Sequence, residues 1–393
     1  MNKKQTINYL SISLILSFIL IGHCKADDDV NRAKQTLESI YNYYSVKGSF
    51  LLRETFPFND SHQVTYLDNA EQAKKKNEFS YLWPFSGSLS AVSALYEAKG
   101  DKGYLDMFDN TVLPGLKLYW DTVRKPGAYA SYIKIKPLPD RFYDDNVWIG
   151  IDFTDMYLSS KNESYLQEAE AVWKFIESGT DSILGDGIYW VEQRKGSKHA
   201  CSNAPGAVYT AKLFMATHNQ YYLKRAKELY SWTKTHLQDP DDYLIYDNIR
   251  RNGFVDKKKY AYNSGQMIQA AALLFQLTND SSYLADAKNI AESAYNFFFR
   301  EISPEIQDNF RFLRSGDIWF TAVMFRGYVE LYYVNKEKKY IDEFRKNLDY
   351  AWLHMRDDNG LFNSDWSGQK KDNSKWLLTQ FAMVEMYARI SRL

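Results

Sequence analysis

Asn279-Asp280-Ser281-Ser282-Tyr283-Leu284 decides the fold, because its pattern of a polar turn followed by an aromatic–aliphatic pair recurs along the chain. The equivalent pairs are Tyr104-Leu105, Tyr165-Leu166, Tyr222-Leu223 and Tyr340-Ile341. Successive pairs lie about 60 residues apart, and each follows a short polar segment that can end one helix and cap the next. Self-similarity at a fixed period indicates an array of equivalent structural units.

Each pair opens an amphipathic helix, and the turn before it closes a more apolar helix. In the unit that starts at Tyr283, apolar residues recur at the helical period, with Asp286, Lys288 and Glu292 between them. The apolar helices have almost no polar face, so we expect them to be buried on most sides. The six predicted apolar helices are Ser88–Ala98, Asn146–Leu158, Ala204–Ala216, Ser264–Leu277, Trp319–Val334 and Lys375–Ile390.

The number of helices predicts how they close. Five apolar helices are followed by an amphipathic helix, and a helix near Asp29–Tyr44 can partner the sixth. The simplest closed arrangement is an all-α fold, an (α/α)6 toroid of six helical hairpins. The repeat is uniform and no Pro- or Gly-rich linker interrupts it, so we expect one domain over residues 24–393.

The connections between helices are unequal, and this predicts where the functional site lies. The turn after each apolar helix is short, whereas the return to the next apolar helix is long and rich in aromatic residues. In a toroid the long connections gather at one end, over the N-termini of the inner helices. Loops on a rigid scaffold usually hold the site. We therefore expect a cleft there, walled by Trp83, Tyr143, Trp190, Tyr262 and Trp366.

The stretch Arg141-Phe142-Tyr143-Asp144-Asp145-Asn146-Val147-Trp148-Ile149-Gly150 lies at one of these helix starts. Two adjacent carboxylates among apolar residues are costly to bury unless they are paired, hydrogen-bonded or used in chemistry. One alternative is that Asp144 or Asp145 caps the helix, since Asp is a favoured N-cap. The other is an acid–base or nucleophile pair that cleaves a bond between sugars. Considered alone, the Asp-Asp dipeptide favours the N-cap. Its position over the expected cleft favours a catalytic role.

The composition excludes several classes of function. The 49 lysines and arginines equal the 49 aspartates and glutamates, so no net charge draws the chain to nucleic acid or to an anionic membrane. The six histidines have no ligand-like spacing, and the chain has no Gly-rich phosphate loop or cysteine cluster, so we expect no metal and no cofactor. Aromatic residues make up 16% of the chain, and flat rings can either fill a core or support the apolar faces of sugars.

The first residues predict export. Lys3 and Lys4 precede a short apolar run, which is typical of a signal peptide, here residues 1–23. Ile21-Gly22-His23-Cys24 resembles a bacterial lipoprotein cleavage box, and the residues after it resemble the acidic surface-export tag of Bacteroidetes lipoproteins. We expect an outer-membrane lipoprotein at the cell surface or in the periplasm, with Cys24 lipidated; cleavage after Ala26 is the alternative. The lipid would be the only contact with the membrane, and we expect a monomer.

The motif Tyr143-Asp144-Asp145-Asn146-Val147-Trp148 resembles the Asp-Asp signature of glycoside hydrolase family 76. Trp83-Pro84-Phe85-Ser86-Gly87, Ser202-Asn203-Ala204-Pro205-Gly206 and Tyr262-Asn263-Ser264-Gly265 resemble the segments of that family at other inner-helix starts. The resemblance implies an (α/α)6 toroid and an endo-acting α-1,6-mannanase whose partner is mannan. It also implies retention of configuration, with Asp144 as nucleophile and Asp145 as general acid/base. The chain departs from the family's usual Gly-Pro and Asn-Gln, having Ala-Pro and Asn-Ser instead.

Retention needs two carboxyl groups roughly 5–5.5 Å apart. Asp317, Glu192 or Asp365 from another long connection could supply the second carboxylate instead, which would make the enzyme inverting. The residues that we expect to bind the substrate in the cleft are Trp83, Tyr143, Asn203, Tyr262, Asn263, Gln266 and Asp317. Each has a structural alternative: packing at the mouth for the rings, and capping or loop bracing for the polar side chains.

Three further points stay open at the level of sequence. Arg250-Arg251 and Lys257-Lys258-Lys259 can form a solvated loop face or contact phosphorylated mannan branches. Another toroid hydrolase, or a lyase acting on acidic sugars, would keep the fold and need a positive cleft. A non-catalytic glycan-binding surface lipoprotein would have lost one of the two acids, and both are present.

Overall fold

The computed structural model describes residues 26–134, 137–301 and 310–393. The predicted signal peptide and Cys24 lie outside these described residues. No helix within them is both long enough and apolar enough to span a bilayer.

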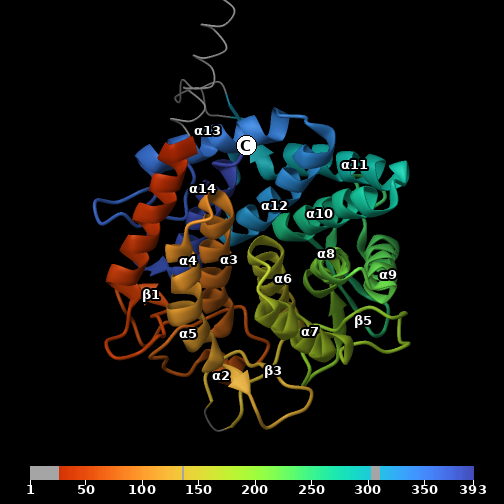
Figure 1. Ribbon diagram of the computed structural model, residues 1–393, viewed down its shortest axis with the longest axis horizontal. Helices are drawn as coiled ribbons and strands as arrows, with labels where there is room; N and C mark the ends of the chain where they lie inside the picture. Colours follow the sequence, from red (N-terminus) through yellow and green to blue (C-terminus); the bar gives the residue numbers. More distant parts are fainter. Residues whose placement is uncertain (1–25, 135–136, 302–309) are drawn as a thin grey trace, which may run out of the picture.

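Six inner helices form a closed ring in which each packs against the next and the last returns to the first (Figure 1). Five of them have 18 residues each, and the sixth has 14. The inner helices are α3 (Leu82–Lys99), α6 (Tyr143–Ser160), α8 (Ala200–Thr217), α10 (Ala261–Thr278), α12 (Ile318–Asn335) and α14 (Leu377–Ile390). The predicted all-α (α/α)6 toroid is confirmed.

An outer layer of helices surrounds this ring. The first outer segment is interrupted by a π turn just before Pro114, a residue that has no backbone N–H to donate. A helix over residues 26–44 is the sixth outer helix, as predicted. The remaining outer elements are α4 (Lys102–Met107), η1 (Phe108–Val112), α5 (Leu113–Lys117), α7 (Glu163–Glu177), α9 (Gln220–Leu237), α11 (Ser281–Phe298) and α13 (Lys339–His354).

The short turns between inner and outer helices have one recurring construction. Five inner helices end at a residue in the left-handed conformation: Gly100, Lys161, His218, Asn279 and Lys336. In the first four, the next residue is an Asp or Asn whose side chain accepts a backbone N–H of the outer helix. One residue thus ends a helix and its neighbour caps the next, which explains why the polar turns repeat in the sequence.

Backbones of adjacent inner helices approach closely at glycines. A Cβ on Gly327 of α12 would lie 2.2 Å from the carbonyl oxygen of Gly265 on α10. A Cβ on Gly150 of α6 would lie 2.1 Å from the ring of Tyr209 on α8. These contacts leave no room for a methyl group. The ring of inner helices therefore has its observed width only with glycine at these positions.

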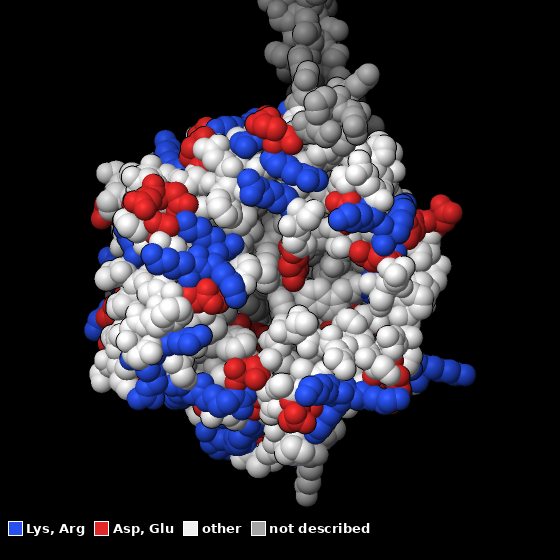
Figure 2. Space-filling view, turned by 180° about the vertical axis from the view of Figure 1, so that it is seen from behind, with Lys and Arg blue, Asp and Glu red and all other residues white. Residues whose placement is uncertain are grey.

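The long connections contain short antiparallel strands that the sequence analysis did not predict, together with the four-residue helix α2 (Ala70–Ala73). Most are two-residue ladders; the largest has the order β4-β5-β6. The strands are β1 (Thr55–Phe56), β2 (Trp120–Asp121), β3 (Ala128–Tyr129), β4 (Ser197–His199), β5 (Tyr246–Arg250), β6 (Val255–Lys259), β7 (Phe299–Arg300), β8 (Phe312–Leu313) and β9 (Lys375–Trp376). Viewed from behind, the molecule is hollowed near its middle, with carboxylates inside the hollow and many cations around it (Figure 2).

Candidate active site

The second residue of five inner helices faces one cleft. These residues are Trp83, Asp144, Cys201, Tyr262 and Trp319. The cleft has a volume of about 830 Å³ and is also lined by residues 62–67 and by parts of the other long connections. The prediction that these connections meet over the inner-helix N-termini is therefore confirmed.

The inner helices begin earlier than predicted, except the last, and this corrects the interpretation of the Asp pair. Helix α6 begins at Tyr143, so Asp144 and Asp145 lie in its first turn and Phe142 is the N-cap. The N-cap makes no side-chain hydrogen bond. Neither Asp144 nor Asp145 is therefore the N-cap, so the capping alternative is wrong.

Asp144 is held by two donors from a different part of the chain. Its Oδ2 accepts a hydrogen bond from the indole Nε1 of Trp190 at 3.0 Å and another from the thiol of Cys201 at 3.3 Å. Its Oδ1 is buried and has no hydrogen-bond partner within the described residues. Burial raises the pKa of Asp144 to about 6, although the Cys201 and Trp190 bonds oppose this shift.

Asp145 has a different environment. It is 9% exposed and lines the cleft beside Asp144. Burial, reinforced by the negative charge of Asp144, raises the pKa of Asp145 well above its usual range. Of the two carboxyl groups, Asp144 therefore gives up its proton first.

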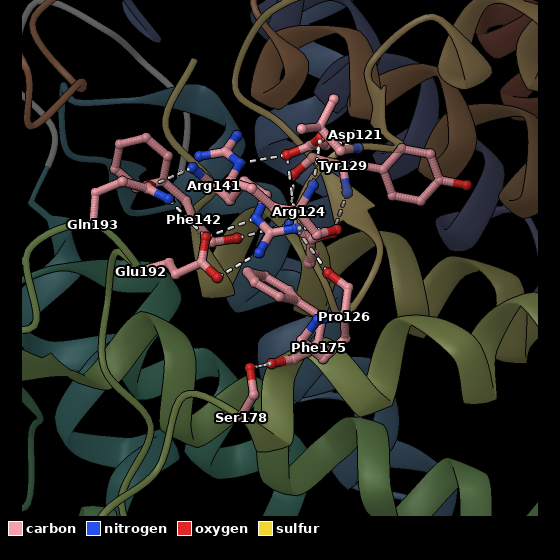
Figure 3. Close-up of polar contacts among 12 residues, drawn as sticks. Asp121, Arg124, Pro126, Tyr129, Arg141, Phe142, Phe175, Ser178, Glu192 and Gln193 are labelled. Atoms are coloured by element: carbon pink, nitrogen blue, oxygen red, sulfur yellow. Dashed lines mark hydrogen bonds and ion pairs between the residues drawn. The ribbon is translucent and has the colours of Figure 1, made fainter. Parts of the chain in front are cut away.

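Arg141 lies just before the start of α6 and makes several polar contacts there (Figure 3). Its guanidinium is fully buried and donates to both carboxylate oxygens of Glu192, one of them at 2.7 Å. It also donates to the carbonyl oxygen of Pro126 at 2.7 Å and lies over the ring of Phe175. The two long connections on either side of α6 are thereby joined next to Asp144, and Glu192 is occupied in this ion pair rather than facing the cleft.

Aromatic rings form much of the cleft wall. Trp83 contacts Tyr66, Trp376 and Trp319 with ring centroids 4.9, 5.2 and 5.3 Å apart. Tyr262 stacks on Phe320 at 4.1 Å with an interplanar angle of 16°. The predicted cleft residues Trp83, Trp190 and Tyr262 all line this space.

Two more carboxylates line the cleft, Asp317 and Asp247. Asp317 is the N-cap of α12 and accepts the backbone N–H of Trp319 at 2.8 Å, while burial raises its pKa to about 6. Burial also raises the pKa of Asp247, against a hydrogen bond from Asn248. The cation in the lining is Lys258, whose Nζ lies 3.7 Å from Asp256, so acidic groups outnumber basic ones. Within the described residues, no three His, Cys, Asp or Glu side chains converge as a metal site.

Several predicted site residues lie outside the cleft. The ring of Tyr143 is fully buried and stacks on Phe175 at 4.6 Å, so the prediction that it forms a platform is wrong. Trp366 is 1% exposed and does not line the cleft either. Asn263 and Gln266 are buried away from it, and Gln266 donates to Gln269 at 2.8 Å.

Asn203 also lies outside the cleft, and the helical repeat explains why. It is the fourth residue of α8, and its amide pairs with the N–H and C=O of Ile188 at 2.6 and 2.9 Å. The fourth residues of α6 and α14, Asn146 and Gln380, bind a residue of the preceding connection in the same way. The bracing alternative for Asn203 is therefore correct, because a fourth residue points away from the side that the second presents to the cleft.

Several residues that line the cleft were not predicted from the sequence. Trp319, Tyr66, Phe320, Asp247 and Cys201 were not singled out as cleft residues. Cys201, Trp319 and Asp144 share one position in their helices, so aligning the helix starts could have identified the first two. Tyr66 and Asp247 lie in irregular connections, where no period marks them.

Comparisons with known proteins agree with this geometry. A family 76 glycoside hydrolase (mannosidase) from Bacteroides thetaiotaomicron is 34% identical, with a TM-score of 0.84, over 93% of this chain and 98% of that one. An inactive variant of an α-1,6-mannanase from Salegentibacter, solved with α-1,6-mannotriose, has the same fold at 23% identity, with a TM-score of 0.72 over 93% of this chain and 99% of that one.

Sequence relatives are more distant. A Candida albicans mannan endo-1,6-alpha-mannosidase is 24% identical over 231 residues, which cover 53% of this chain and 50% of the relative. The chain spans about half the length of the curated relatives it matches. The model of the glycosyl hydrolase family 76 matches residues 57–391, so the chain belongs to this family.

Proposed function

We propose that the protein is an endo-acting hydrolase of α-1,6-mannosidic bonds in mannan backbones. The names of the Candida and Salegentibacter relatives support this linkage. The cleft volume of about 830 Å³ lies toward the upper end of the roughly 300–1,000 Å³ of ligand sites, which favours a chain of sugars over a single ring.

The observation that carries the proposal is the unequal environment of two adjacent carboxyl groups in the cleft. Asp144 accepts two hydrogen bonds, which stabilise its ionised form. Asp145 accepts none within the described residues, and its pKa is raised the further of the two. A retaining glycosidase needs an ionised nucleophile beside a protonated acid, and this is the order in which the pair loses its protons.

The proposed reaction has two steps. In the first, Asp145 donates its proton to the glycosidic oxygen while the Asp144 carboxylate bonds to the anomeric carbon, so that the glycosidic bond breaks and a glycosyl ester forms. In the second, Asp145 removes a proton from water, and the resulting oxygen displaces Asp144 from the anomeric carbon. Asp144 is then ionised and Asp145 protonated again, and the configuration is retained.

The walls of the cleft would bind the neighbouring sugars. Trp83 and Tyr262 present ring faces or edges that suit the apolar C–H surface of mannose. Asp317 and Asp247 can accept hydrogen bonds from sugar hydroxyls. Asp317 also caps α12, so it serves the fold and the site together.

Specific observations count against the alternatives. A lyase or hydrolase for acidic sugars would need a positive cleft, and four aspartates face one lysine here. Phosphorylated branches would meet the same acidic lining, and Lys259 is bound by Asp239 and Asp242. For an inverting mechanism, Glu192 and Asp365 do not line the cleft, which leaves Asp317 as the second carboxylate.

We also propose that the chain is exported as a lipoprotein, for which the support is the sequence of residues 1–29 alone. Labelling with radioactive palmitate in a bacterial host tests this: the native chain should be labelled and a Cys24→Ser variant should not. Equal labelling of both would exclude a lipid on Cys24.

The test of the proposed activity is incubation of the purified protein with unbranched α-1,6-mannan, followed by chromatography of the products. We expect a ladder of short oligosaccharides. Proton NMR of the first product should show the α anomer, as retention requires. Mannose as the sole product would contradict the endo mode, and no product at all would contradict the proposed substrate. A β anomer would instead favour inversion with Asp317.

A further inference from the structure

Three cleft residues from three helices are linked by polar contacts. The thiol of Cys201 on α8 donates to Oδ2 of Asp144 on α6 at 3.3 Å. The hydroxyl of Tyr262 on α10 in turn interacts with the sulfur of Cys201. All three are the second residues of consecutive inner helices, so the toroid repeat itself places them side by side.

Each of these three residues is held in place by its surroundings. The ring of Tyr262 stacks on Phe320, which fixes the direction of its hydroxyl. Cys201 is 3% exposed in the first turn of α8. Trp190, whose ring stacks on His199 at 4.8 Å, donates to the same oxygen of Asp144 as the thiol does. The Asp144 carboxylate therefore has one of its oxygens bound from two sides.

We propose that Cys201 is a positioning residue that, together with Tyr262, orients the Asp144 carboxylate for catalysis. The proposal rests on the proposed function of Asp144 as the nucleophile. Cys201 does not touch the reacting atoms and acts through the oxygen that it holds. Without the thiol, one of two donors is lost, and the carboxylate can turn about its Cβ–Cγ bond away from the productive geometry.

The thiol is suited to donate rather than to react. Burial, together with the negative charges of Asp144 and Asp247, raises the pKa of the Cys201 thiol well above its usual range. Besides Asp144, the carboxyl and ammonium groups that line the cleft with these residues are Asp145 on α6, Asp247 on β5, Lys258 on β6 and Asp317, the N-cap of α12. Acids predominate among them, so the thiol keeps its proton and remains a hydrogen-bond donor at neutral pH.

The first experiment needs no turnover, so it stays informative even if the proposed substrate is wrong. The sequence has two cysteines, so a Cys24→Ser chain has Cys201 as its single thiol and gives one S–H stretching band in the infrared. Replacing Asp144 by Ala removes the acceptor, and we expect the band to move to higher frequency. Asp144→Asn, which retains a weaker acceptor and the side-chain shape, should move it less in the same direction. An unchanged band in both variants would overturn the proposal.

The second experiment measures kinetics on α-1,6-mannan. Cys201→Ala should lower kcat by on the order of 10-fold with little change in KM, because the interaction acts on the reacting group rather than on distant sugars. Cys201→Ser retains a donor and should recover part of kcat. Tyr262→Phe keeps the stacked ring, removes only the hydroxyl, and should lower kcat by a smaller factor.

Ser202→Ala is the matched control, because Ser202 is the next residue of α8 and its buried hydroxyl has no partner within the described residues. We expect this control to keep the kcat and the S–H band of the parent. If Cys201→Ala keeps the parent kcat, or if Cys201→Ser is no better than Cys201→Ala, Cys201 serves only to pack the helix. If the parent does not cleave the mannan, the proposed function fails, and the S–H band still decides whether the thiol is bound to Asp144.

Discussion

Arg326 on α12 and Glu385 on α14 form a two-point ion pair inside the ring, with N–O distances of 2.6 and 2.8 Å. Their side chains are 3% and 1% exposed. Arg389 binds the same carboxylate at 2.6 Å. Burial alone would raise the pKa of Glu385, but the two guanidinium groups lower it to about 2. Arg389 also lies 3.8 Å from Glu97 on α3, so this ion-pair network links the last two inner helices to the first.

We therefore expect Arg326→Met to destabilise the protein by about 3–5 kcal/mol at pH 7, because Glu385 would lose a buried partner. Urea unfolding followed by circular dichroism measures this loss. Replacing both residues, as Arg326→Met with Glu385→Leu, should recover part of it, since no carboxylate is then left without Arg326. Arg389 would keep Glu97, at 3.8 Å, as its carboxylate partner. A single variant as stable as the parent would show that Arg389 suffices to hold Glu385.

Asp144→Asn and Asp145→Asn should each lower kcat by on the order of 10³-fold or more while the helical circular dichroism spectrum stays that of the parent. Added azide separates their roles. With Asp144→Ala, azide should form mannosyl azide of inverted configuration, because it replaces the nucleophile. With Asp145→Ala, azide should attack the glycosyl ester and give the retained configuration. If each variant gave the product expected of the other, Asp145 would be the nucleophile and Asp144 the general acid/base.

The pH dependence of kcat/KM should be bell-shaped. Activity should rise as Asp144 loses its proton near its pKa of about 6 and fall as Asp145, whose pKa is raised further, loses its own. Both apparent values belong to the pair. Trp190→Phe removes one donor to Asp144, so its acid limb should move to higher pH. An acid limb that stays in place would show that the indole does not stabilise the ionised form of Asp144.

Asp145→Asn should make the protein more stable above about pH 4, where an Asp of the unfolded chain has lost its proton. Burial raises the pKa of Asp145 in the folded state, so the folded chain holds a proton that the unfolded chain has released. The stability of the parent therefore falls as pH rises toward the folded-state pKa of Asp145. The variant has no carboxyl group at this position, so it does not lose this stability. We expect a Tm higher by a few degrees at pH 8 than in the parent, and no difference at pH 3. A variant less stable at pH 8 would contradict this.

Asn203→Ala should cost about 1–3 kcal/mol of stability, because it leaves the N–H and C=O of Ile188 buried without their partner. Thermal or urea unfolding measures the loss. If Asn203 only braces the connection, KM for mannan should change little in the protein that remains folded. A large rise in KM at unchanged stability would show instead that Asn203 binds the substrate. Asn146→Ala tests the same role at the equivalent position of α6.

The repeat made most of the fold predictable, because each turn needs a helix-ending residue and a capping Asp or Asn at fixed positions, as at Gly100-Asp101 and Asn279-Asp280. The helix starts were placed too late where segments with aromatic residues, such as Leu82-Trp83 and Tyr143, were taken for loop. The ladder that pairs Thr55 with Trp376 joins segments more than 300 residues apart, and no local pattern marks such a pairing.

By itself, the sequence determined the helical period, the capped turns, the ring of six hairpins and the adjacent carboxylates at one inner-helix start, since all of these are set by interactions between near neighbours in the chain. Only the tertiary structure decided which side chains meet. It turned Asp144 toward Trp190 and Cys201, buried Tyr143 against Phe175, and directed Asn203 to Ile188. A shift of one or two residues in a helix start rotates every side chain about the helix axis by roughly 100° or 200°, so the cleft lining depends on a register that packing of the whole ring fixes.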